Sequence, residues 1–121
     1  MAEKTADKKV EFKAPTQPIT VTLNHPLTAH GEEHTQLTFR LPTGEDMMEI
    51  GYPINIKMDG GKFGGVTVMK EEMAGMIAAL AGIPPSSLKK MHYTDYAKCI
   101  GAVNAFFMPS LIDLYLTGIS I

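Results

Sequence analysis

Apolar residues recur with the period of a helix in two stretches between residues 69 and 107. The first stretch carries an apolar stripe formed by Met69, Met73, Met76, Ile77 and Leu80. Gly82 is placed to end this helix, and Thr94 is placed as the N-cap of the next. The apolar face of the second helix consists of Tyr96, Cys99, Ile100, Val103, Phe106 and Phe107. The elbow at 82–85 therefore predicts two helices folded against each other.

The residues before position 69 have the period of strands. Apolar residues alternate with polar ones over 19–23 and again over 37–41, with a break at Pro26 and a turn at 31–33 between them. A second pair of alternating segments, 54–58 and 66–68, flanks a glycine-rich turn. The segment 66–68 can alternatively form the first turn of the methionine-rich helix. Two antiparallel hairpins with one apolar face each are expected, and these faces need a cover because an isolated hairpin is marginal in water.

Proline and glycine place the shorter elements. Thr43 is placed as the cap of a helix with acids in its first turn, and this helix must be short because Gly51 follows. Residues 84–86 can open another short helical turn. The long helix that starts at Thr94 is expected to stop or kink near Pro109, since a proline inside a helix clashes with the preceding turn.

Together these patterns predict a small single-domain α+β protein, in which N-terminal antiparallel β-hairpins pack on a C-terminal helical half. A chain of 121 residues, 45% of them hydrophobic, is long enough for one domain with a core and too short for two. We expect a flexible N-terminal tail over 1–18, the α+β domain over 19–108, and an apolar, helical C-terminal segment over 109–121.

Charge and cysteine content exclude several classes of protein. The formal net charge of -2 argues against a general nucleic-acid binder, which needs a concentrated basic surface. The single cysteine, Cys99, cannot form an internal disulfide and is most simply a small apolar residue on a helix face. The first residues show no secretion signal, which favours a cytoplasmic protein. The nine methionines are more often gap-fillers in a core than an adaptable binding surface.

The candidate chemical motifs are weak. His25, His30 and His34 lie close together but lack the paired ligand spacing that is typical of a structural zinc site. The run 60–65 lacks the Gly-Lys-Ser or Gly-Lys-Thr of a phosphate-binding loop, and glycines in a hairpin connection explain it. No serine or cysteine has a convincing base nearby in the sequence. We therefore expect no catalytic residue, no cofactor and no metal.

The apolar C-terminal region allows three interpretations. A transmembrane helix would contain Asn104, Pro109 and Asp113, and an acid near a bilayer centre costs about 2.5 to 3.5 kcal/mol, which argues against a membrane protein. The segment can instead pack as a last helix over the hairpins, or it can leave an apolar surface for a partner. The last two interpretations are compatible. We place the partner-binding surface at Leu111, Ile112, Tyr115 and Leu116.

Two separated blocks of residues resemble a known family. The first block comprises Ile19, Leu23, His25-Pro26-Leu27, Gly31-Glu32-Glu33, Leu37-Thr38-Phe39-Arg40, Pro42-Thr43-Gly44 and Asp46. The second comprises residues 80–88, Thr94-Asp95-Tyr96 and Phe106-Phe107. In this order, over residues 19–107, they resemble phage tail assembly chaperones of the protein E family, found in Mu-like and other contractile-tailed phages. The segment 52–65 is longer and richer in glycine than the family pattern, and the region from Pro109 extends beyond its usual end.

The resemblance implies a non-enzymatic chaperone that acts in the host bacterial cytoplasm while the tail is built. Such proteins are expected to bind the tape measure protein, to keep its apolar helices soluble, and to bring tail tube subunits to it. Binding would offer apolar area to amphipathic helices of the tape measure protein. The alternatives are a structural subunit retained in the tail, a small ligand-binding protein that uses the glycine-rich loop, and a membrane-associated protein. Spare apolar surface also allows a homo-oligomer.

Overall fold

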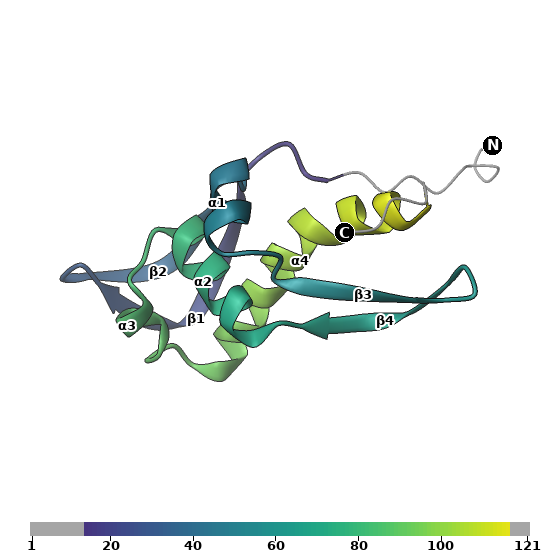
Figure 1. Ribbon diagram of the computed structural model, residues 1–121. Helices are drawn as coiled ribbons and strands as arrows, with labels where there is room; N and C mark the ends of the chain where they lie inside the picture. The colour runs from purple at the N-terminus through teal and green to yellow at the C-terminus, as the bar shows by residue number, and fades with distance from the viewer. Residues whose placement is uncertain (1–13, 117–121) are drawn as a thin grey trace, which may run out of the picture.

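The computed structural model describes residues 14–116 and contains two hairpins and four helices within that range (Figure 1). In chain order the elements are β1 (Ile19–Ala29), β2 (Glu32–Phe39), α1 (Gly44–Glu49), β3 (Ile54–Asp59), β4 (Lys62–Val68), α2 (Lys70–Ala81), α3 (Pro85–Leu88) and α4 (Tyr93–Leu116). Strand β1 pairs with β2 and strand β3 with β4, both antiparallel, in two separate sheets. The predicted α+β class, with hairpins packed on helices, is confirmed.

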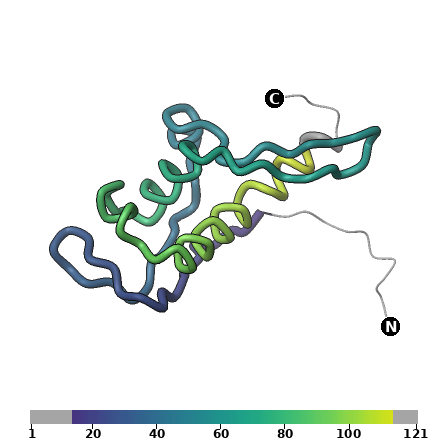
Figure 2. The backbone as a smooth tube through the Cα atoms, turned by 90° about the horizontal axis from the view of Figure 1, so that it is seen from below, coloured from purple at the N-terminus to yellow at the C-terminus, as the bar shows by residue number. Residues whose placement is uncertain are grey.

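The two hairpins extend in opposite directions from a helical centre (Figures 1 and 2). Helix α4 runs between them and contacts both β1 and β3, while α2 contacts β2 and α4. Helix α3 links α2 to β1. Because each sheet has only two strands, neither could bury its apolar face alone, and the helices supply the missing cover.

Each hairpin closes with two residues that both have positive φ. His30 and Gly31 have φ values of 55° and 75°, and Gly60 and Gly61 have values of 55° and 82°. This backbone conformation matches the right-handed twist of paired strands and favours glycine. The interpretation of the glycine-rich run 60–65 as a hairpin connection is confirmed for Gly60 and Gly61, whereas residues 62–65 belong to strand β4. The first turn lies at 30–31 rather than at 31–33.

Strand β1 does not end at Pro26, contrary to the predicted break. The register with β2 shifts between Thr22 and Leu27, so that a bulge accommodates the intervening residues and the strand continues to Ala29. A proline lacks the N–H that a regular ladder requires, and a bulge is one of the few places in a sheet where it fits.

The alternative assignment of residues 66–68 to the methionine-rich helix is wrong. Val68 pairs with Ile54 across the second hairpin, and the Met69 N–H donates to the Pro53 carbonyl at 2.9 Å. Helix α2 starts only at Lys70. Its end is as predicted, because Gly82 adopts φ 71° and donates its N–H to the carbonyl of Ala78.

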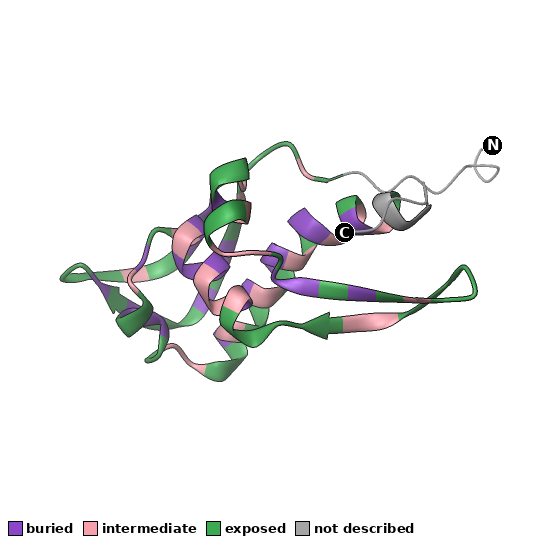
Figure 3. Cartoon of the chain, in the orientation of Figure 1, coloured by how far each residue is buried: buried purple, intermediate pink, exposed green. Residues whose placement is uncertain are grey.

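The core lies where the two helices meet the inner faces of the hairpins, as the purple segments of Figure 3 show. Its largest fully buried apolar side chains are Phe39, Ile54, Met73, Met76, Ile77 and Val103. The core interpretation of the methionines is confirmed for Met73 and Met76, but Met48 is 88% exposed. Ala78 and Ala102, which fall outside the predicted apolar stripes, are also buried.

Helix α4 starts one residue earlier than predicted and does not stop at Pro109. The Nδ1 atom of His92 accepts the Thr94 N–H at 3.3 Å, so His92 rather than Thr94 satisfies a free donor of the first turn. Pro109 cannot donate to the carbonyl of Ala105, but Leu111 beyond it is only 3% exposed and holds the last turns on the core. No helix among residues 14–116, α4 included, combines the length and hydropathy needed to cross a membrane.

The start of α1 is held by the predicted cap and by one ion pair. Thr43 Oγ1 accepts the Asp46 N–H, and Asp46 Oδ2 accepts the Thr43 N–H at 2.8 Å, which is a capping box. Both terminal nitrogens of Arg40 donate to the Asp46 carboxylate, at 2.7 and 3.0 Å. The Arg40 N–H donates to the carbonyl of Leu80, so this cluster also ties the end of β2 to α2.

The ion pair between Arg40 and Asp46 should make the stability of the fold depend on pH in the acid range. The guanidinium of Arg40, above all, lowers the pKa of Asp46 from 3.8 to about 2. The carboxylate therefore adds stability above pH 3.8, and this contribution disappears as the pH falls through about 2. We expect Asp46→Asn to lower the free energy of unfolding at pH 7 by about 1 kcal/mol. The effect stays this small because the half-exposed Arg40 is partly screened by water.

Urea unfolding of the wild type and of Asp46→Asn at pH 7 and at pH 2.5 measures the difference between their free energies of unfolding. It should shrink at the lower pH, whereas Asp59→Asn, which removes an exposed acid from the tip of the second hairpin, should have little effect at either. An unchanged difference at the two pH values would contradict the assignment.

Candidate functional site

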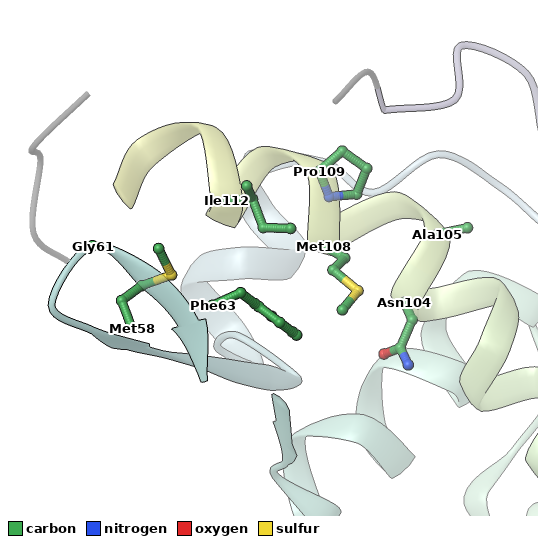
Figure 4. Close-up of a pocket in the computed structure, with 8 residues that line it drawn as sticks. All are labelled: Met58, Gly61, Phe63, Asn104, Ala105, Met108, Pro109 and Ile112. Atoms are coloured by element: carbon green, nitrogen blue, oxygen red, sulfur yellow. The ribbon is translucent and has the colours of Figure 1, made fainter. Parts of the chain in front are cut away.

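An open apolar groove lies between the outer part of the β3–β4 hairpin and the C-terminal half of α4 (Figure 4). Its volume is about 750 Å³. We call it the hairpin–helix groove; it is lined by Met58, Gly61, Phe63, Asn104, Ala105, Met108, Pro109 and Ile112. Among the described residues that line it, none is charged and one, Asn104, has a polar side chain.

The hairpin wall of the groove depends on a bulge in β4. Lys57 pairs with Gly65, but Met58 pairs with Phe63, so Gly64 is the extra residue. The bulge brings Phe63 directly opposite Met58, where cross-strand side chains share one face of the sheet. A Cβ atom on Gly64 would lie 3.2 Å from the Lys57 carbonyl oxygen, which explains why glycine suits this position.

The same hairpin changes from covered to open along its length. Ile54 and Ile56 on β3 are each 2% exposed beneath α4, and Met58, the next residue on that face, is half-buried. Phe63 is 53% exposed. Figure 3 shows the strand β4 as largely exposed or intermediate. The hairpin therefore carries its apolar face beyond the part that the helix covers.

The helix wall consists of a second stripe on α4, which is apolar except for Asn104. Asn104, Met108 and Ile112 repeat every four residues and so share one face of the helix. The core stripe lies beside it and contains Val103, Phe107 and Leu111, each one position earlier. Figure 4 shows Met108 and Phe63 extending into the space between helix and hairpin. Two adjacent apolar stripes explain why this part of the chain is apolar on more than one side.

The predicted partner-binding residues have different surroundings. Leu111 is 3% exposed and belongs to the core, whereas Ile112 is partly buried and lines the hairpin–helix groove. Tyr115 and Leu116 lie in the last turn of α4, and their side chains fall outside the described part of the structure. Within this set, the structure therefore associates Ile112 with the groove.

Sequence reasoning missed the hairpin side of the groove. Phe63 is the only aromatic residue in the glycine-rich run, and this was the available signal. Met58 resembled an ordinary strand residue, and Met108 lay outside the recognised helical face. Asn104 was noted only as a polar interruption of an apolar stretch.

The three clustered histidines are not brought together. The His25 ring stacks on that of His92 with centroids 3.8 Å apart. His30 Nε2 lies 3.3 Å from the carbonyl oxygen of Gly82, and His34 Nε2 lies 3.4 Å from that of Ala29. Within residues 14–116 no three metal-ligating side chains gather into a site.

At the other end of α4, Asp95 joins the helix to the bulge of β1. Its carboxylate is fully buried and accepts the N–H groups of Asn24 and His25, at 2.9 and 3.0 Å. The Asn24 N–H, first among several causes, lowers the pKa of Asp95. Lys98 Nζ lies 3.9 Å from the carboxylate and donates to the carbonyl of Thr22. Both carboxylate oxygens accept hydrogen bonds that hold α4 on β1, so Asp95 is a structural residue.

Cys99 is not placed for nucleophilic chemistry. The thiol is completely buried, and burial raises its pKa to about 11. Its Sγ lies 3.8 Å from the sulfur of Met91. A protonated, inaccessible thiol is a poor nucleophile, which agrees with its interpretation as a small apolar residue on the helix face.

Comparison with known proteins identifies the family. The model of the phage tail assembly chaperone proteins E, or 41 or 14, matches residues 20–108. No curated protein and no solved structure matches the chain. The matched region includes both hairpins and most of α4, and it agrees with the resemblance noted over residues 19–107. This family is non-enzymatic, so the groove is interpreted as a surface for binding rather than for catalysis. The chain belongs to the family of phage tail assembly chaperones.

Proposed function

We propose that this chaperone binds the tape measure protein of the phage tail in the cytoplasm of the host bacterium and helps to recruit tail tube subunits to it. Membership of the family implies tail proteins as partners. The observation that supports the finer assignment is the hairpin–helix groove, an open apolar surface whose described lining residues carry no charge. Such a surface is typical of a protein-interaction site.

The proposed binding surface combines the groove with the end of α4. Ile112 lines the groove, and Tyr115 and Leu116 follow it in the last turn of the same helix. Leu111 supports this region from the core side. A long apolar helix of the tape measure protein could lie along this surface, and its apolar face would be removed from water while the tail is unfinished.

Co-expression with the tape measure protein encoded in the same genome tests the proposal. We expect a soluble complex, recovered by pull-down, that forms only when both proteins are present. An unrelated helical protein of low solubility, co-expressed in the same way, serves as the control and should remain insoluble. A well-folded but unbound chaperone beside an insoluble tape measure protein would contradict the proposal.

Two further measurements separate the remaining roles. Adding the tail tube protein to the soluble complex should produce a complex of all three proteins, which tests recruitment. Purified phage particles should lack the chaperone. Its presence there in stoichiometric amounts would indicate a structural subunit of the tail instead.

A further inference from the structure

Asn104 places an unsatisfied hydrogen-bond acceptor beside the hairpin–helix groove. Its side-chain oxygen Oδ1 is buried and has no hydrogen-bond partner among the described residues. Buried side-chain polar atoms are paired in the large majority of cases, because an unpaired one loses its contacts with water without replacement. The free protein therefore retains a polar group whose cost is not offset within the described fold.

The surroundings of Asn104 restrict what could satisfy it. Asn104, Met108 and Ile112 follow one another along about 12 Å of α4, which corresponds to two helical turns. Phe63 and Met58 form the opposite wall (Figure 4). None of the described residues that line the groove is charged, so a charge buried against them would lack a counter-charge. An electrostatically complementary occupant is elongated, apolar and uncharged, with a single donor near Asn104.

We propose that the groove takes the apolar face of an amphipathic helix of the tape measure protein, that the Asn104 amide turns toward this helix, and that one donor within its apolar face, from Gln, Asn, Ser or Thr, then pairs with Asn104 Oδ1. The inference rests on the proposed function and adds the chemistry of the segment bound. A single polar residue in an apolar helix contact sets the register of the two helices. Asn104 would thus select which part of a long apolar client is seated in the groove.

Thermal unfolding of the protein alone gives the first test. Asn104→Leu removes the unpaired oxygen, so we expect its Tm to equal or exceed that of the wild type. Asn55→Leu makes the same change on the exposed face of β3 and serves as the matched control. A clearly lower Tm for Asn104→Leu alone would mean that the amide is already paired in the free protein, which would overturn the inference.

Binding of tiled peptides from the tape measure protein gives the second test. Peptides of about 20 residues are long enough to form helices on the surface. A tryptophan on the polar face of each peptide supplies the fluorescence signal, because the chaperone has none. The peptides that bind should share an apolar stripe with i, i+4, i+7 spacing and one uncharged donor within it.

A double-mutant cycle then assigns the hydrogen bond. The donor of a binding peptide is replaced by an apolar residue of similar size, for example Gln by Met, and each peptide is titrated against wild type, Asn104→Leu and Asn55→Leu. We expect the peptide change to weaken binding to the wild type and to Asn55→Leu about tenfold more than to Asn104→Leu. Equal effects on all three proteins would overturn the pairing.

The remaining outcomes separate this inference from the proposed function. If no peptide binds while the full-length tape measure protein is still made soluble, the groove inference fails and the function stands. If the full-length protein is not bound either, the function itself fails. Sedimentation of the chaperone alone is the last check, because a dimer that Phe63→Asp converts to monomers would assign the groove to a second copy of this chain.

Discussion

Replacing Asp95 by alanine is expected to cause the largest loss of stability of any single exchange of a polar residue in the described chain. The carboxylate is fully buried and accepts the N–H groups of Asn24 and His25 in the bulge of β1. Alanine would leave both donors unpaired inside the protein and would free the bulge from α4. We expect the Tm to fall by roughly 10 °C or more, as measured by circular dichroism.

Asp95→Asn and Asp113→Asn provide the comparison. Asparagine keeps the size of the side chain but offers one acceptor where two donors must be met, so Asp95→Asn should lie between alanine and the wild type. Asp113 is an exposed acid on the same helix, and its exchange should change the Tm little. Equal Tm values for the wild type, Asp95→Ala and Asp95→Asn would show that the carboxylate does not hold the bulge.

The lowered pKa of Asp95 also sets the direction of the pH dependence. The carboxylate contributes stability above its ordinary value of 3.8, and that contribution is lost as the pH falls below it. The difference in Tm between wild type and Asp95→Asn should therefore be largest near neutral pH and should narrow in acid.

Replacing Phe63 by aspartate is expected to reduce the function strongly while changing the stability of the fold little. The ring is 53% exposed at the outer wall of the hairpin–helix groove, so the fold does not depend on its burial. A carboxylate there would meet the apolar face of a bound helix without a counter-charge. We expect at least about a tenfold drop in soluble tape measure protein on co-expression, the size typical of a central interface residue.

Met48→Asp is the matched control for this exchange. Met48 is the most exposed large apolar side chain among the described residues, at 88%, and it lies on α1 outside the groove. The control should retain full client solubility, and both variants should keep the wild-type Tm within a few degrees. Equal losses for the two variants would indicate a general effect of surface charge, and no loss for Phe63→Asp would remove the groove from the binding surface.

Several features were predictable because the interacting residues are neighbours in the sequence. The capping box of Thr43 and Asp46, the left-handed Gly82 at the end of α2 and the Gly60-Gly61 turn each depend on a few consecutive residues. The hairpins and the apolar faces of both long helices follow from periodicity, which is also a local property. These features suffice for the fold class, while the family resemblance rests on two separated blocks of residues.

The ends of strands and helices were predicted wrongly where contacts between residues distant in the sequence determine them. A proline normally interrupts a strand, but β1 continues past Pro26 because Asp95, about 70 residues later, pairs with the bulge. Of the two outcomes predicted at Pro109, a stop or a kink, the stop does not occur: α4 continues past Pro109 because Leu111 is buried against the core. In both cases tertiary contacts offset a local penalty that is visible in the sequence.

The α+β class and most of the elements follow from the amino-acid sequence, since they rest on local periodicity, caps and turns. The chaperone family follows from the resemblance of two separated blocks of residues. The hairpin–helix groove, by contrast, arises only from tertiary packing. The bulge at Gly64 sets the register that brings Phe63 opposite Met58, and the packing of α4 on β3 then places Asn104, Met108 and Ile112 across from them. No local pattern encodes this site, because its two walls are about 40 residues or more apart in the chain and meet only when the core forms.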